Sequence, residues 1–197
     1  DALRASEERL NQAQRIARVG NWELDLASGR LSWSDEIFRI FEIDKAKFGA
    51  TYEAFLSAIH PGDRDLVNAA YTDSLKTRKP YDITHRLRMA DGRIKYVHER
   101  CESKFDVEGK PLSSIGTVQD ITERKLADEA LAESHRLLQT IIGTVPVRIF
   151  WKDRELRYLG CNLAFAKDAG EVGPDDLIGK DDYQLGWKAQ AEIYRAD

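Results

Sequence analysis

Apolar and polar residues alternate along five short stretches of the chain, and a period of two is typical of β-strands. Two stretches lie before residue 34 and three lie after residue 80. The predicted strands are Trp22–Leu26, Leu31–Trp33, Tyr81–Met89, Ile94–Lys104 and Leu112–Ile121. Asp91-Gly92 and Glu108-Gly109 are turn sequences, so the last three strands form an antiparallel meander. We therefore expect an α+β domain with one five-stranded antiparallel sheet and helices on one face.

The residues between the two groups of strands have helical spacing. Ile37, Phe38 and Phe41 share one face of a helix that begins at Asp35. A second short helix is expected over residues 52–58, and the sequence His-Pro-Gly-Asp at 60–63 then interrupts the chain. Its last residue, Asp63, is a suitable N-cap for a third helix over residues 64–76. The inner face of that helix would carry Val67, Ala70, Tyr71 and Leu75.

Two further helices flank this region and have the spacing of coiled-coil seams. The first seam is formed by Leu3, Ser6, Leu10, Ala13 and Ala17, and Gly20 is expected to end its helix. The second helix runs over residues 122–142, with Ala127, Leu131, Ser134, Leu138 and Ile141 on one face. These seams favour a parallel homodimer. The alternative is that both helices are amphipathic and pack on their own domain.

Residues 116–125 join the last predicted strand directly to the second flanking helix. Val118 and Ile121 favour a strand, Thr122 can cap the helix, and Glu123 adds negative charge to its first turn. Because no flexible loop intervenes, a change in the sheet would pass into the helix. The alternative is a capped strand–helix boundary without a relay role.

The last part of the chain begins the same plan again. Val147, Ile149 and Trp151 alternate with other residues, a strand follows over 157–161, and a helix carries Phe165. Phe165 corresponds to Phe38, and Leu137 corresponds to Leu10 at the same distance along the chain. One more helix is expected over 187–194. Only the first two strands of a second sheet are present, so we expect this region to be the beginning of a second domain in a longer protein.

Composition narrows the function classes. Hydrophobic residues make up 42% of the 197 residues and charged residues 32%, which is typical of a globular chain. The net charge is −4 without a basic block, so no nucleic-acid surface is expected. No apolar run is long enough for a membrane span. Cys101 and Cys161 lie far apart, which fits a reduced, cytoplasmic protein, although the parent protein can be membrane-anchored.

Several short motifs, in this order and spacing, make residues 20–125 resemble a PAS domain with its C-terminal PAC motif, also called a sensory box. They are Gly20-Asn21-Trp22-Glu23-Leu24-Asp25, Trp33-Ser34-Asp35-Glu36, Ile59-His60-Pro61-Gly62-Asp63-Arg64, Arg86-Leu87-Arg88, Asp91-Gly92-Arg93 and Gly116–Lys125. Residues 145–197 resemble the first half of a second PAS domain. The domain plan is therefore a linker helix at 1–19, a PAS domain at 20–121, a signalling helix at 122–143 and a partial PAS domain at 144–197.

The resemblance implies a sensory and relay module of a bacterial signal-transduction protein. The implied output enzyme is a sensor histidine kinase of a two-component system, or else a diguanylate cyclase, in a domain downstream of this chain. It implies that Asp120 ties the last strand to the start of the domain and to the outgoing helix. The expected relay residues are Trp22, Glu23, Asp25, Asp120, Ile121 and Thr122. The alternative is a ligand-free dimerisation module.

A small ligand, if present, would bind between the sheet and the helices. The predicted wall residues are Phe38, Phe41, Phe55, Ile59, Tyr71, Leu87, Val97 and Ile115, with a filled core as the alternative. His85 is in phase with Tyr81 and Leu87 and is the best inward-facing polar candidate, although it can also be a hydrogen-bonded core residue.

No cofactor is required by the sequence, and flavin and haem both stay open. Haem needs an axial ligand such as histidine, and His60 and His98 are candidates with a structural alternative. The Asn-Cys-Arg-Phe-Leu-Gln stretch of photoactive flavin domains is absent, which leaves only a dark, redox-type flavin. His135 lacks the flanking sequence of a kinase phosphoacceptor, and Asp181-Asp182 is a poor metal pair. We expect no catalysis and no metal site in this chain; an unrecognised enzyme site in the cleft is the other alternative.

Overall fold

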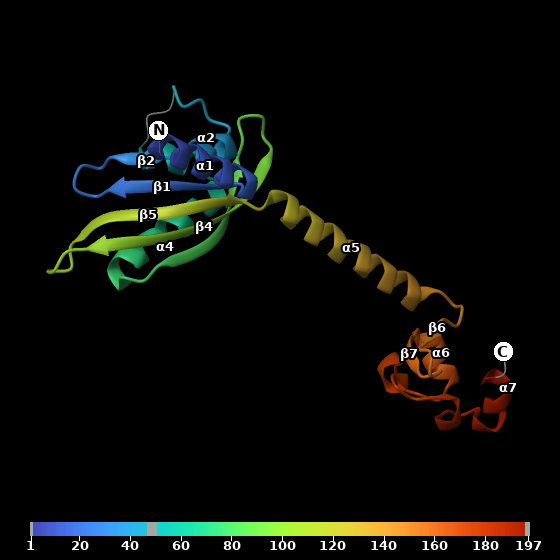
Figure 1. The fold of residues 1–197 in the computed structure, drawn as a ribbon. Helices are drawn as coiled ribbons and strands as arrows, with labels where there is room; N and C mark the ends of the chain where they lie inside the picture. The colour runs from blue at the N-terminus through green and yellow to red at the C-terminus, as the bar shows by residue number, and fades with distance from the viewer. Residues whose placement is uncertain (1, 47–50, 196–197) are drawn as a thin grey trace. The chain divides into compact units, whose positions relative to one another are not determined.

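The computed structural model describes residues 2–46 and 51–195 and divides between Ala127 and Asp128 into two compact units. The first unit contains a five-stranded antiparallel sheet with the order β2-β1-β5-β4-β3 (Figure 1). The strands are β1 Val19–Asp25, β2 Leu31–Trp33, β3 Tyr81–Arg88, β4 Ile94–Phe105 and β5 Pro111–Asp120. The predicted α+β class and five-stranded antiparallel sheet are therefore confirmed.

The helices of the first unit are α1 Ala2–Ala17, α2 Asp35–Phe41, α3 Tyr52–Ala58 and α4 Arg64–Thr77, with a single 3₁₀ turn, η1 Pro61–Asp63, before α4. Ile37, Phe55 and Val67 are buried on α2, α3 and α4, and they pack in one core with the inward residues of the sheet. Along β4 every second residue is buried from Val97 to Cys101, as expected for a sheet with one covered face. The sheet and these three helices thus enclose a single apolar core.

The first helix ends earlier than its sequence suggested. α1 ends at Ala17, and Arg18 adopts a left-handed conformation with φ 51°. Gly20, which was predicted to end the helix, lies instead in β1 under α2. A Cβ atom at Gly20 would lie 2.4 Å from Ile37 Cγ1, so glycine is needed there for close packing of α2 on the sheet.

Asp63 occupies the N-cap position of α4, but its side chain makes no capping hydrogen bond. Its carboxylate instead accepts hydrogen bonds from the Arg86 backbone N, Nε and Nη2 at 2.8, 3.0 and 2.6 Å. Asp63 is therefore the N-cap residue, as predicted, but its side chain does not cap the helix. The bidentate, charged Arg86 on β3 binds the carboxylate more strongly than a neutral helix amide would. The contact fastens the start of α4 to the sheet.

The signalling helix α5 runs over Thr122–Thr144, past Gly143, which was expected to stop it. None of its residues is buried, and Leu131, Leu138 and Ile141 of the predicted seam are 71%, 54% and 46% exposed. An exposed apolar seam is compatible with association through this helix, and the coiled coil stays a prediction.

The second unit has two antiparallel strands, β6 Phe150–Lys152 and β7 Tyr158–Cys161, followed by α6 Leu163–Asp168. Three 3₁₀ turns and one helix complete it: η2 Pro174–Leu177, η3 Asp182–Gln184, η4 Lys188–Gln190 and α7 Ala191–Arg195. The single helix predicted over 187–194 is thus a 3₁₀ turn and a short helix. Tyr158, Phe165 and Leu177 are buried together in a small core of its own.

Candidate functional site

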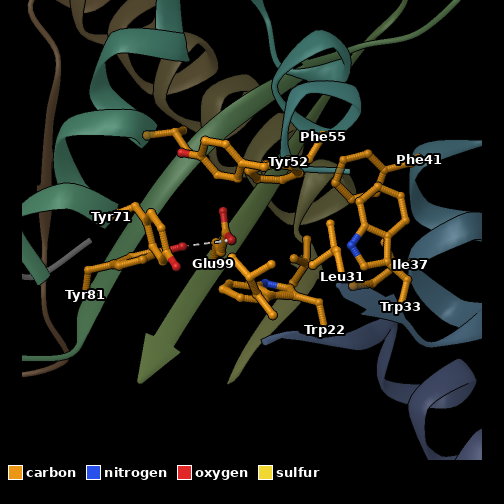
Figure 2. Close-up of a pocket in the computed structure, with 13 residues that line it drawn as sticks. Trp22, Leu31, Trp33, Ile37, Phe41, Tyr52, Phe55, Tyr71, Tyr81 and Glu99 are labelled. Carbon is orange, nitrogen blue, oxygen red and sulfur yellow. Dashed lines mark hydrogen bonds between the residues drawn. The ribbon is translucent and has the colours of Figure 1, made fainter. Parts of the chain in front are cut away.

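A small cavity lies between the sheet and the helices of the first unit (Figure 2). Its lining is dominated by aromatic rings and contains one carboxylate, and comprises Trp22, Leu24, Leu31, Trp33, Ile37, Phe41, Tyr52, Phe55, Val67, Tyr71, Tyr81, Glu99 and Val118. The volume open to the centre of a water-sized sphere is about 20 Å³. That is little more than one water molecule needs, so side chains nearly fill the core.

Glu99 brings a buried carboxylate to this cavity. The Tyr81 hydroxyl donates to Glu99 Oε1 at 2.9 Å, and His85 Nε2 lies 2.9 Å from Oε2. The His85 and Glu99 side chains are both 0% exposed. Burial raises the pKa of Tyr81, and the neighbouring Glu99 carboxylate raises it further. The cluster is therefore a desolvated polar group held within an apolar core, where each lost partner is costly.

His85 was predicted from the sequence, but Glu99 was not. The alternation along β4 could have identified it, because Val97, Glu99 and Cys101 occupy alternate positions that face the core. Two nitrogens in this core, Trp22 Nε1 and His85 Nδ1, are buried without a hydrogen-bond partner among the described residues.

The predicted wall residues divide into three groups. Phe41, Phe55 and Tyr71 line the cavity. Ile59, Leu87 and Val97 are buried in the same core but are not among the lining residues, and half-buried Phe38 packs against the Trp33 ring. Ile115 is 47% exposed, so its placement on the inner face was wrong. The buried residues of β5 are Ser114, Gly116 and Val118, which sets Ile115 on the opposite face.

The two histidines considered as haem ligands are not at the cavity. His60 Nδ1 accepts a hydrogen bond from Gly62 N at the start of η1. His98 lies on β4 and is hydrogen-bonded to Asp82. A cavity of about 20 Å³ also has no room for a porphyrin or an isoalloxazine ring. The described residues, as arranged, therefore do not fit a haem or a flavin.

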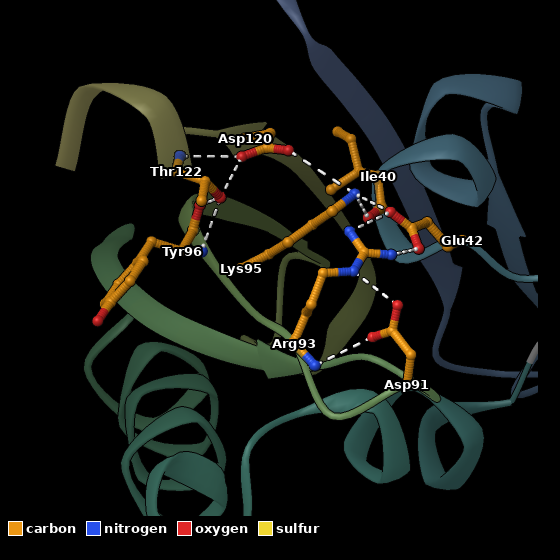
Figure 3. A network of polar contacts seen from close by, with 8 residues as sticks. All are labelled: Ile40, Glu42, Asp91, Arg93, Lys95, Tyr96, Asp120 and Thr122. Carbon is orange, nitrogen blue, oxygen red and sulfur yellow. Dashed lines mark hydrogen bonds and ion pairs between the residues drawn. The ribbon is translucent and has the colours of Figure 1, made fainter. Parts of the chain in front are cut away.

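A polar network surrounds the junction of β5 and α5 (Figure 3). Asp120 Oδ1 accepts hydrogen bonds from Thr122 N at 2.9 Å and from Thr122 Oγ1 at 2.6 Å. Asp120 N donates to Arg18 O at 3.0 Å, just before β1. Thr122 is already the first helical residue, so Asp120, rather than Thr122, satisfies the first free amide of α5. One residue thus joins the start of the domain to the outgoing helix.

Lys95 on β4 extends this network to α2. Its ammonium donates to Ile40 O at 2.8 Å, pairs with Glu42 Oε1 at 2.9 Å and lies 3.9 Å from Asp120 Oδ2. Arg93, in the β3–β4 turn, also pairs with Glu42 at 2.7 Å. The hydrogen bond from Lys95, and then that from Arg93, lowers the pKa of Glu42. Sequence reasoning missed Lys95 and Glu42, whose partners are distant in the chain.

The other predicted relay residues lie in different places. Trp22 is buried, and its register partner on β5 is Gly116. Ile121 N donates to Tyr96 O at 3.0 Å and so belongs to the junction. Glu23 is exposed.

Asp25 binds the amides of Ala27 and Ser28 in the β1–β2 turn. It pairs in register with Ser113, at the opposite end of β5 from Asp120. Asp25 therefore does not join the junction network, and the neighbour of Asp120 on this side is Arg18.

Residues 30–118 match the family model described as the PAS fold. This part of the chain is a PAS domain. β1 lies before the matched residues, but it pairs with both β2 and β5, so the PAS sheet begins at Val19. The relatives described next include a sensor protein and a sensory box histidine kinase, which agrees with a PAS domain that is a sensory module of signal transduction.

The PAS domain is similar to a solved structure of a sensory box histidine kinase/response regulator from Burkholderia thailandensis. Their sequences are 26% identical, the TM-score is 0.56, and the match covers 67% of this chain and 98% of that one. Among curated proteins, the chain is 26% identical over 166 residues to the probable diguanylate cyclase DgcE of Escherichia coli, covering 83% of this chain and 15% of the relative. It is 29% identical over 128 residues to the sensor protein FixL of Bradyrhizobium diazoefficiens, covering 65% of this chain and 25% of FixL.

The chain therefore spans a quarter or less of the length of these two curated relatives. Within residues 2–46 and 51–195, no helix is long and apolar enough to cross a membrane. In the same ranges, no group of three or more histidine, cysteine or acidic side chains is placed to hold a metal ion.

Proposed function

We propose that the PAS domain is a relay module of a bacterial signal-transduction protein and that its output leaves through α5. The observation that carries this proposal is the position of Asp120. Its carboxylate accepts both the backbone and the side-chain hydrogen bond of Thr122, and its amide binds Arg18 O. A displacement of β5 against β1 therefore changes the support of the first turn of α5.

The Lys95 ammonium gives the relay two alternative partners. Lys95 is held at 2.9 Å by Glu42 and stands 3.9 Å from Asp120, so a small shift of α2 would exchange one carboxylate for the other. Such an exchange between two discrete ion pairs is a two-state element that can bias a helix. A signal shifts this equilibrium only by its difference in affinity for the two states.

For the whole protein we propose an output domain downstream in the same chain. A sensor histidine kinase is the first candidate and a diguanylate cyclase the second, because relatives of both kinds match the chain. The fragment itself would carry out no catalysis and would act in the cytoplasm. The proposed partition stays a linker helix at 1–19, the PAS domain at 20–121, the signalling helix at 122–143 and half of a second PAS domain at 144–197. The exposed α5 seam supports a homodimer.

Replacement of Asp120 by alanine in the full-length parent tests the relay. We expect the output activity to lose its response to the stimulus while the PAS domain stays folded, because the helix amide loses its acceptor but the core is unchanged. Asp73→Ala, at an exposed acid on α4, is the matched control. Equal stimulus responses in the parent, Asp120→Ala and Asp73→Ala would refute the proposed role.

The second candidate function is a ligand-free dimerisation module. The nearly filled cavity favours it, because about 20 Å³ leaves no room for a drug-sized ligand. Native mass spectrometry and an absorption spectrum of the freshly purified protein distinguish the two. A small molecule that co-purifies in stoichiometric amount would contradict the ligand-free hypothesis. A monomeric protein at micromolar concentration would contradict the dimer hypothesis.

A further inference from the structure

A second hollow lies outside the PAS core, where α1, α2, β4 and β5 meet. Its volume is about 270 Å³. Its walls carry four cationic and two acidic side chains and comprise Arg15, Arg18, Glu36, Arg39, Ile40, Lys95 and Asp120. The hollow shares no lining residue with the aromatic cavity. Two of its lining residues, Lys95 and Asp120, also belong to the polar network at the junction of β5 and α5.

The arginines of this hollow retain unused hydrogen-bond donors. Arg18 Nη1 lies 2.8 Å from Glu123 Oε1, and Arg39 Nη1 donates to Glu36 Oε2 at 2.7 Å. Both arginine side chains are 50% exposed. Exposed Arg15 has no ion pair within the described part of the chain. Since each guanidinium has five N–H groups, most of the arginine donors at this hollow have no acceptor among the residues that the structure describes.

The acidic side chains of the hollow are already engaged. Glu36 is buried and directed to Arg39, and Asp120 is directed to Thr122. Glu42 and Glu123 stand outside the lining and balance Lys95 and Arg18 in formal charge. A ligand would therefore be held by hydrogen bonds from the arginine N–H groups rather than by a large net positive charge. That arrangement selects a ligand with several acceptor oxygens on one small group.

We propose that this hollow binds a phosphate group, free or as a phosphomonoester, through Arg15, Arg18 and Arg39. A phosphate offers three or more oxygens to the planar guanidinium groups. Arginine is better suited than lysine to this bidentate pairing. The bound group would connect the end of α1 to α2 and would compete with Asp120 for Lys95. It would thereby act on the PAS exit from outside the core, a role that does not depend on a ligand in the aromatic cavity.

Isothermal titration of the full 197-residue chain with inorganic phosphate, at constant ionic strength, tests the site. We expect saturable binding that weakens at least tenfold in Arg15→Ala and further in the Arg15→Ala/Arg39→Ala double variant. Arg30→Ala, an exposed arginine in the β1–β2 turn, is the matched control and should bind as the wild type does. Because Arg15 is exposed, its replacement should leave the circular dichroism spectrum unchanged.

A parallel titration with glycerol 3-phosphate separates the two sources of the group. Tighter binding of the ester assigns the site to a phosphomonoester, and tighter binding of inorganic phosphate assigns it to the free ion. Hydrogen exchange of the first-turn amides of α5 should change on binding. Absence of saturable binding for both compounds, or equal affinities in the wild type and the double variant, would overturn the proposal while leaving the Asp120 relay untouched.

Discussion

Replacement of Asp63 by asparagine measures how strongly α4 is fastened to the sheet. The hydrogen bonds from Arg86 lower the pKa of Asp63 from its ordinary 3.8 to about 2. A lowered pKa stabilises the fold by about 1.4 kcal/mol for each pH unit of difference, which gives an upper limit of about 2.5 kcal/mol at neutral pH. Because the Arg86 side chain is 39% exposed, we expect a smaller loss of about 1–2 kcal/mol in Asp63→Asn.

The pH dependence fixes the sign of this effect. The unfolded chain binds a proton at Asp63 near pH 3.8 and the folded chain only near pH 2, so the stabilisation is complete above pH 3.8 and is lost as the pH falls through 2. About half of it should be gone at pH 3. The difference in unfolding free energy between the wild type and Asp63→Asn should therefore shrink between pH 6 and pH 3.

Urea unfolding followed through the backbone amide signals of β3 and β4 measures this difference within the first unit alone. Asp65→Asn, an acid in the first turn of α4, serves as the control and should show a smaller, less pH-dependent change. A difference between wild type and Asp63→Asn that is the same at pH 6 and pH 3 would show that the ion pair does not stabilise the fold.

Two core substitutions test the packing and the polar cluster of the PAS domain. In Gly116→Ala the new Cβ would lie 2.4 Å from Trp22 Cε2, and we expect a loss of about 1–3 kcal/mol in urea unfolding; wild-type stability would mean that the ring moves freely. Tyr81→Phe removes the donor to Glu99 and should cost about 1–3 kcal/mol, whereas Tyr96→Phe, whose hydroxyl has no hydrogen bond among the described residues, should change stability by less than about 0.5 kcal/mol. Equal stabilities of the two phenylalanine variants would contradict the buried-cluster interpretation.

Local patterns were sufficient to predict most of the PAS fold. The alternation around Trp22 and along residues 81–89 identified strands because one face of the sheet is buried and the other is not. α3 begins at Tyr52 and ends at Ala58, as predicted. Local rules failed where a distant residue decides the outcome. Asp63 has the sequence of a cap, but Arg86, which follows it by 23 residues, takes its carboxylate.

The candidate sites were less predictable than the fold. Glu99 was passed over because a charged residue on an inward strand position conflicts with the usual preference for apolar cores. Its partners Tyr81 and His85 lie on the neighbouring strand and meet it only through the β3–β4 register. Lys95 was not predicted because its partner Glu42 is 53 positions away in the chain and meets it only in the folded structure. Contacts of this kind depend on register and helix placement, which no single-sequence pattern contains.

The two ends of the PAS domain meet at one point. The chain enters at Arg18 and leaves at Asp120, and a hydrogen bond of 3.0 Å joins their backbones. A domain whose ends are adjacent can be inserted between two segments of a host protein, or removed, with little loop-closure entropy and little displacement of the host. The hydrogen bond between Arg18 and Asp120 thus gives a physical reason why such a domain can be inserted into a host chain without redesign of its neighbours.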